Sequence, residues 1–111
     1  MEIRDTEKVC IFAPLSPKLD RYESTRILNK ISKESRDIAL DLRFVQDCTI
    51  DFIETLRKIA LTKNIGIFNI PSDIFVLFNV MQIDKTVRLF VCEPDFEEDT
   101  RQLINRKFSI V

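Results

Sequence analysis

The sequence predicts a single α/β domain with a mixed, mostly parallel sheet of four to five strands and about four helices. Two patterns predict this class. Four short apolar runs have the usual length of strands, and segments with helical periodicity separate them; the runs are residues 9–13, 38–42, 65–70 and 87–92. Alternation of this kind favours parallel pairing through right-handed crossovers. The length of 111 residues suits one domain spanning residues 1–111, with a core that needs no metal or disulfide.

The expected strands are almost continuously apolar, which is typical of strands covered on both faces. Residues 2–4 are expected to add a short antiparallel edge strand that turns back near residues 5–8. Asp41 interrupts the run at residues 38–42. Its carboxylate must either find hydrogen-bond donors or reach the end of the sheet, and its place late in the strand favours the second.

Two helices are expected in the first half of the chain. The first follows Asp20, which forms a capping arrangement with Glu23 three residues later. The second runs from about residue 49 to residue 63. Its apolar residues recur at helical spacing, and they are Ile53, Leu56, Ile59 and Ala60.

The third expected helix, which enters through Pro71 and Ser72, is apolar most of the way round. Its main apolar stripe consists of Ile74, Leu77, Phe78 and Met81. Phe75, Val76 and Val80 lie off that stripe. Such a helix is either deeply buried or in contact with another protein, and the pattern leaves both interpretations open.

A fourth helix is expected to begin near Asp95. The acidic residues 97–99 suit the positive end of a helix dipole. The apolar side of this helix would be formed by Leu103, Ile104 and Phe108, and Arg106 and Lys107 would suit its C-terminal end.

Composition argues against several functions. With 17 basic and 18 acidic residues the formal charge is −1, so we expect no general attraction for nucleic acid. Histidine is absent, which removes histidine triads and histidine metal sites. Gly66 is the only glycine, so no glycine-rich phosphate loop exists. We therefore expect no enzyme, no cofactor and no metal.

Location signals are equally sparse. No run approaches the roughly 18 apolar residues of a membrane span, so we expect no membrane insertion. Residues 1–8 lack an apolar signal core. Three cysteines without CxxC spacing favour a reducing compartment, and we expect a cytoplasmic protein.

Cys48 is the only candidate nucleophile. It precedes an expected helix N-terminus, where a thiolate would be stabilised, but Asp47 beside it opposes that effect. No histidine is available as a base. The favoured interpretation is a half-buried loop cysteine, and Cys10 and Cys92 are expected to be small core residues.

Three stretches of the sequence resemble a STAS domain, the fold of bacterial anti-sigma-factor antagonists and of the cytoplasmic tails of sulfate transporters. They are Lys-Leu-Asp at residues 18–20, Ile-Ala-Leu-Asp-Leu-Arg-Phe-Val at 38–45, and Ile-Gly-Ile-Phe-Asn-Ile-Pro at 65–71. The middle stretch is the most specific, because it looks like the central strand of the family. The resemblance covers about residues 2–108 and implies a role in signal transduction and transcription regulation.

The phosphorylation motif of that family is degenerate here. The family usually carries Asp-Ser-Ser-Gly-Leu after its central strand, and a partner kinase phosphorylates the serine after the aspartate. This chain has Cys-Thr-Ile-Asp-Phe-Ile at residues 48–53. An ungapped comparison places Ile50 at the acceptor, and a shift of one residue places Asp51 there. The resemblance therefore implies a module without the usual phosphoserine switch.

The sequence leaves two possible roles open for Asp51 and two for Thr49. Asp51 could supply a permanent negative charge in place of a phosphate, or it could cap the second helix, which is the favoured interpretation. Thr49 is the only nearby hydroxyl. It is either a displaced phospho-acceptor or the N-cap of the helix.

The resemblance implies a partner-binding surface at the start of the second helix, with the loop at residues 14–18 nearby. Its residues are Asp20, Cys48, Thr49, Ile50, Asp51 and Phe52. Phe52 would be its apolar anchor, and Asp51 would be the charge that selects the partner. The expected partner is an anti-sigma factor or a serine-kinase-like protein. The alternative is an accessory or regulatory subunit of a membrane transporter or a larger scaffold, with Phe75, Val76 and Val80 in the contact. A homo-oligomer is left open.

Overall fold

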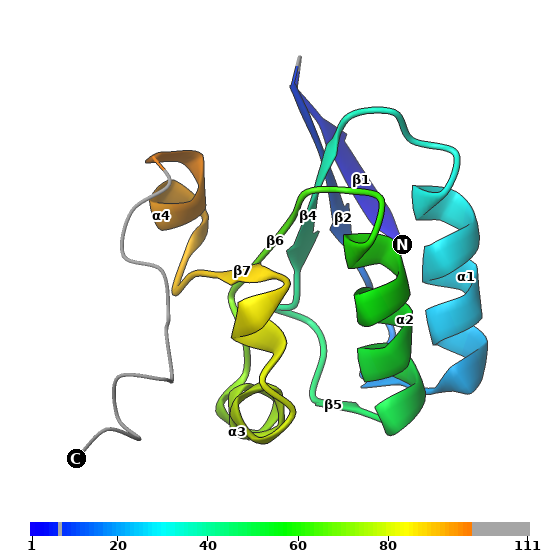
Figure 1. Cartoon of the computed structure of the whole chain (residues 1–111), viewed down its shortest axis with the longest axis vertical. Helices are drawn as coiled ribbons and strands as arrows, with labels where there is room; N and C mark the ends of the chain where they lie inside the picture. Colours follow the sequence, from blue (N-terminus) through cyan, green and yellow to red (C-terminus); the bar gives the residue numbers. More distant parts are fainter. Residues whose placement is uncertain (7, 99–111) are drawn as a thin grey trace.

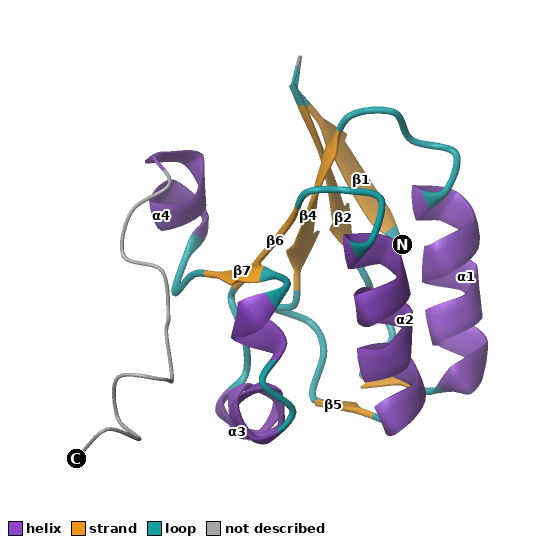
Figure 2. Cartoon of the chain, viewed as in Figure 1, coloured by secondary structure: helices purple, strands orange, loops and turns teal. Residues whose placement is uncertain are grey.

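The computed structural model describes residues 1–6 and 8–98. A five-stranded sheet forms its middle layer (Figures 1 and 2). Helices α1 (Arg21–Ile31) and α2 (Ile50–Ala60) lie side by side on one face of the sheet. Helix α4 (Glu93–Glu98) lies on the other side of it.

The sheet has the order β1-β2-β4-β6-β7. Its strands are β1 (Glu2–Asp5), β2 (Val9–Ala13), β4 (Asp37–Asp41), β6 (Ile65–Phe68) and β7 (Arg88–Leu89). Strand β1 pairs antiparallel with β2, and all the other pairs are parallel. The predicted α/β class and the antiparallel edge strand are thus confirmed.

The remaining elements are short or lie at the end of the sheet. Strands β3 (Lys18–Leu19) and β5 (Asp47–Cys48) form a separate parallel pair. Helix α3 (Ser72–Val80) follows β6, and the 3-10 helix η1 (Ile83–Lys85) leads from it to β7. Figure 1 shows α3 near β5, at the end of the molecule where α2 begins.

Two apolar cores flank the sheet. The larger core lies under α1, α2 and α3 and includes Ile27, Ile38, Leu56 and Phe78. The smaller core consists of Ile11, Ala39, Phe68, Phe90 and Phe96. Strands covered on both faces explain why their sequences read as continuous apolar runs.

Several strands and helices differ in length from the sequence expectation. Strand β6 ends at Phe68 because Asn69 adopts a left-handed conformation with φ of 55°, which cannot continue a strand. Strand β7 covers only two residues of the expected run at 87–92. Helix α2 ends at Ala60, three residues before the expected end.

Helix α4 begins at Glu93, two residues earlier than expected. The residues expected to form its apolar side and basic end, 103–108, lie outside the described residues. Within residues 1–6 and 8–98, no helix combines the length and apolar character that a membrane span requires.

Candidate functional site

The β3–β5 pair brings the starts of α1 and α2 together. Leu19 pairs with Cys48, and the backbone N–H of Thr49 donates to the carbonyl oxygen of Leu19 at 3.0 Å. Helix α1 begins two residues after Leu19, and α2 begins two residues after Cys48. The two helix N-termini therefore lie beside each other, at the edge of the sheet where the parallel strands end.

Asp20 is the N-cap of α1, as predicted. Its carboxylate Oδ1 accepts a hydrogen bond from the backbone N–H of Glu23 at 3.0 Å. This contact satisfies one of the free donors of the first turn. Asp20 is exposed, so its second oxygen is accessible at the surface.

Thr49 occupies the N-cap position of α2, which was one of its two predicted roles. Its hydroxyl makes no capping bond and instead donates to the carbonyl oxygen of Leu19 at 3.3 Å. Thr49 is half-buried. Phosphorylation of this hydroxyl would require the contact with Leu19 to break, and its role as a phospho-acceptor stays a prediction.

Asp51 lies in the first turn of α2 and is exposed. The favoured interpretation of Asp51 as the cap of this helix is wrong, because Thr49 holds the N-cap position two residues earlier. The carboxylate instead sits near the positive end of the helix dipole, where a negative charge is favourable. It presents a permanent charge to solvent at the tip of the helix.

Phe52 is not a surface anchor. Its side chain is 0% exposed and belongs to the larger core, so the prediction that it contacts a partner is wrong. Helical phase explains this position, because Phe52 shares the core-facing side of α2 with Ile53, Leu56 and Ile59. Ile50 lies on the other side and is 54% exposed, so it is the apolar side chain at the tip of α2.

Two further apolar residues lie near this tip. The loop at residues 14–18, which carries Leu15, was expected beside the surface, whereas Phe44 was not predicted. Leu15 and Phe44 are both exposed, and they lie on the loops that lead to β3 and β5. Gln46 and Asp47 donate backbone N–H bonds to the carbonyl oxygen of Pro17, which holds the two loops together. Leu15 is a single apolar residue among prolines and a serine, which was a signal of exposure. Phe44 stands in an apolar stretch with the buried Leu42 and Val45, so no such signal existed for it.

Cys48 is buried at the end of β5. Burial, and to a lesser extent the charge of Asp47, raises the pKa of its thiol to about 11. The thiol is therefore protonated at neutral pH. This agrees with a structural cysteine and gives Cys48 no direct role in a surface contact, contrary to its predicted place in the partner-binding set.

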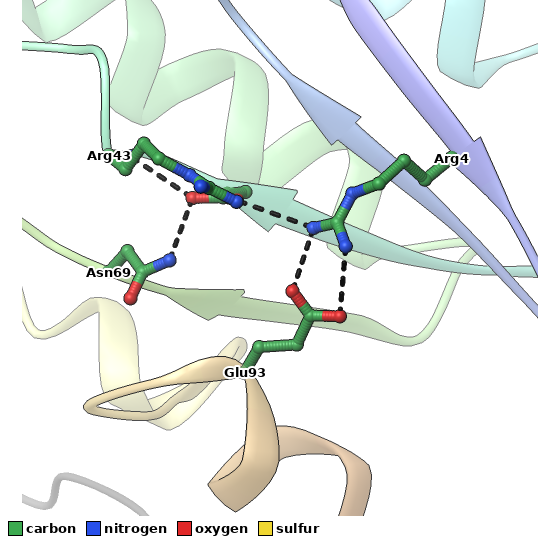
Figure 3. A network of polar contacts seen from close by, with 5 residues as sticks. Arg4, Arg43, Asn69 and Glu93 are labelled. Atoms are coloured by element: carbon green, nitrogen blue, oxygen red, sulfur yellow. Dashed lines mark hydrogen bonds and ion pairs between the residues drawn. The ribbon is translucent and has the colours of Figure 1, made fainter.

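Asp41 is the centre of a polar network at the end of β4 (Figure 3). Its side chain is 0% exposed. The carboxylate accepts from the backbone N–H of Arg43 at 3.1 Å, from the guanidinium of Arg43 at 2.8 Å and 3.1 Å, and from the amide of Asn69 at 3.0 Å. Arg4 approaches it at 3.4 Å.

The network keeps the buried carboxylate charged. Burial acts to raise the pKa of Asp41, but hydrogen bonds from Arg43 and Asn69 outweigh it and hold the pKa below its usual value. The sequence left two ways to accommodate the Asp41 carboxylate, at the end of the sheet or beside hydrogen-bond donors. The structure combines them, since Asp41 lies at the end of its strand and also has donors. The network joins the loop after β4, which leads to β5 and the tip of α2, to Asn69 directly after β6.

Helix α3 divides into a buried and an exposed side. Ile74 and Phe78 are buried, and Phe75 is half-buried against the larger core. Val76 and Val80 are 60% and 72% exposed. Both predicted interpretations hold in part, because one side of the helix is core and the other faces solvent. The exposed side is an apolar surface on a helix that also contacts β5.

Within the described part of the chain, no group of three histidine, cysteine, aspartate or glutamate side chains is placed to hold a metal ion. No protein-family model matches the sequence, and no curated protein matches it either. The resemblance to STAS domains therefore stays a prediction that depends on the three sequence stretches.

Proposed function

We propose that this chain is a non-enzymatic protein-interaction module of the anti-sigma-factor-antagonist type. It binds a protein partner through the tip of α2 and the two loops beside it, without the usual phosphoserine switch. The observation that carries this proposal is the exposed pair Ile50 and Asp51, which places an apolar side chain and a permanent charge next to each other at the start of a helix.

The surroundings of the pair suit a protein contact. Ile50, Leu15 and Phe44 supply exposed apolar area on elements that the β3–β5 pair joins. Asp20 and Asp47 add exposed carboxylates on the same two segments. Apolar groups within a charged surround are the usual composition of transient protein interfaces.

Asp51 would take the place of a removable phosphate. A phosphoserine carries a charge of about −1.5 to −2 at neutral pH, whereas an aspartate carries about −1 permanently. Binding by this module would therefore not depend on a kinase reaction. The partner expected from the resemblance is an anti-sigma factor or a serine-kinase-like protein, with cationic groups facing Asp51. The free cysteines support placing this activity in the reducing cytoplasm.

The test is a calorimetric titration of candidate anti-sigma-factor kinases with wild-type protein and with Ile50→Asp. We expect the substitution to weaken binding by at least roughly tenfold, because a charge would replace a desolvated apolar group at the contact. The matched control is Leu61→Asp. Leu61 lies just after the other end of α2 and is 84% exposed, so this variant makes the same chemical change away from the surface.

Equal weakening by both variants would contradict the location of the surface. Unchanged binding with Ile50→Asp would contradict it as well. Because Ile50 is exposed, the substitution should leave the thermal unfolding curve close to that of the wild type, and this separates a loss of binding from a loss of folding.

Helix α3 favours a second candidate function, as an accessory subunit of a transporter or scaffold. Val76 and Val80 lie one turn apart and are both exposed, which forms a short apolar stripe. This candidate predicts self-association of the isolated chain. Light scattering should then report an oligomer that Val76→Asp with Val80→Asp converts to a monomer, and a monomeric wild type would argue against it.

A further inference from the structure

Among residues 1–6 and 8–98, few side chains cover the second face of the sheet. Its apolar residues Ile11, Ala39, Phe68 and Phe90 form the smaller core with a single residue of α4, Phe96. The described part of helix α4 spans six residues, and of the sheet strands it packs mainly on β6. A segment held by few buried contacts can open at lower free energy than the whole domain.

The position of the Phe96 ring depends on Gly66. A Cβ atom at position 66 would lie 2.5 Å from Cε1 of Phe96, so a side chain there would displace the ring. The ring centroid of Phe96 lies 5.5 Å from that of Phe68 and 5.6 Å from that of Phe90. Glycine at this position of β6 therefore creates the space that α4 occupies.

Polar groups attach α4 as well. The guanidinium of Arg88 lies 5.9 Å from the centroid of the Phe96 ring, and an ion pair holds the first residue of the helix. Both guanidinium ends of Arg4 donate to the carboxylate of Glu93, at 3.0 Å and 2.7 Å (Figure 3). This bidentate contact joins the edge strand β1 to the first residue of α4. Paired charge-assisted hydrogen bonds of this kind are directional and stronger than neutral ones.

The same ion pair reaches the loop beside the candidate partner surface. Arg4 contacts both Glu93 and Asp41, and Asp41 accepts bonds from the backbone and side chain of Arg43. Arg43 is followed directly by Phe44 in the loop that leads to β5 and the tip of α2. A continuous set of hydrogen bonds therefore connects α4 to that loop.

We propose that α4 (residues 93–98) is a latch that detaches as a unit from the second face of the sheet, and that its docked state orders the β4–β5 loop. When α4 detaches, Arg4 loses Glu93 and its guanidinium is no longer held against Asp41. The loop that carries Phe44 then becomes more mobile. Regulation of partner binding by this latch rests on the proposed function of the α2 tip.

The test is residue-resolved amide hydrogen exchange of the wild type and of Glu93→Gln. Glutamine keeps the size of the side chain and removes its charge. We expect roughly tenfold faster exchange in α4, at the amides of residues 96–98, because a charge-assisted contact is lost. We expect faster exchange of the hydrogen-bonded loop amides of Arg43, Val45 and Gln46 as well. Glu97→Gln, an exposed change on the same helix, should alter neither group.

Gly66→Ala provides an independent variant, because it displaces the Phe96 ring without replacing any charged residue. It should accelerate the same two groups of amides. Faster exchange in α4 with an unchanged loop, in both variants, would overturn the coupling. Unchanged exchange in α4 would overturn the latch. Equal acceleration of the amides of β4, which report opening of the whole domain, would show that α4 does not detach by itself and would overturn it too.

These exchange measurements need no partner. The latch can therefore be refuted without refuting the proposed function, and the reverse also holds. Faster exchange in the loop together with unchanged binding by Ile50→Asp would refute the function and leave the latch intact. If both hold, Glu93→Gln should also weaken the partner's binding, since a less ordered loop loses more entropy when it docks.

Discussion

At the scale of single residues, Asp41 shows how a charge can be buried inside an apolar strand. The sequence indicated that its carboxylate needed donors or the end of the sheet, and the structure provides both. Arg43, two residues away, was a foreseeable donor. Asn69 and Arg4 were not, because only the pairing of β1, β2, β4 and β6 brings them to the same place.

We predict that Asp41→Asn lowers the free energy of unfolding by about 2 kcal/mol, because it removes a charged acceptor from several buried hydrogen bonds. Urea denaturation measures this change. Asp37→Asn is the matched control, since Asp37 lies on the same strand, is exposed, and accepts a long contact of 3.4 Å from the amide of Asn64. Equal effects of the two substitutions would contradict the role given to the network.

Glu34 provides a prediction on pH. Hydrogen bonds from the side chain and then the backbone of Arg36 lower the pKa of its carboxyl from 4.5 to about 2. Because the folded-state pKa is the lower one, the resulting stabilisation is complete above pH 4.5 and is lost as the pH falls towards 2. Carboxyl NMR titration should show this low value, and Arg36→Gln should return it towards 4.5; a wild-type value near 4.5 would contradict the contact.

At the scale of secondary-structure elements, helical periodicity correctly predicted where the helices form. The same periodicity also indicates which side of each helix is exposed, but it was not applied to that question in α2. The start of α2 and its apolar residues followed from spacing. Phe52 was placed on the surface by comparison with a family motif, although its helical phase puts it with Ile53 and Leu56 in the core. Each step along a helix rotates the side chain by about 100°, so two steps place Ile50 and Phe52 on nearly opposite sides. Ile50 rather than Phe52 is therefore available to a partner.

Helix α3 allows a direct comparison of its two sides. We predict that Phe78→Ala costs about 3–5 kcal/mol of stability, because it leaves a cavity in the larger core. Val76→Ala should change stability by no more than about 0.5 kcal/mol, since its side chain is already in water. Thermal or urea unfolding distinguishes them, and similar costs for the two would mean that the exposed side of α3 is covered.

At the scale of the whole molecule, alternation of strand and helix was sufficient to predict the sheet and its parallel pairing. Crossover connections between neighbouring strands leave few alternatives. The β3–β5 pair was not predictable, because two residues per strand carry no periodicity. The attachment of α4 was also beyond the sequence, since it depends on Gly66 and on an ion pair between residues 89 positions apart.

The proposed function requires that partner selection depend on a permanent charge at the tip of α2. The most direct measurement is the affinity of the unphosphorylated protein for a candidate kinase-like partner, compared between the wild type and Asp51→Arg. Asp37→Arg is the charge-matched control, because Asp37 is exposed at the start of β4, away from both the α2 tip and α4. We predict that the unmodified wild type binds, that Asp51→Arg weakens binding by roughly tenfold or more, and that Asp37→Arg has little effect. Binding that appears only after phosphorylation, or that Asp51→Arg leaves unchanged, would contradict this requirement.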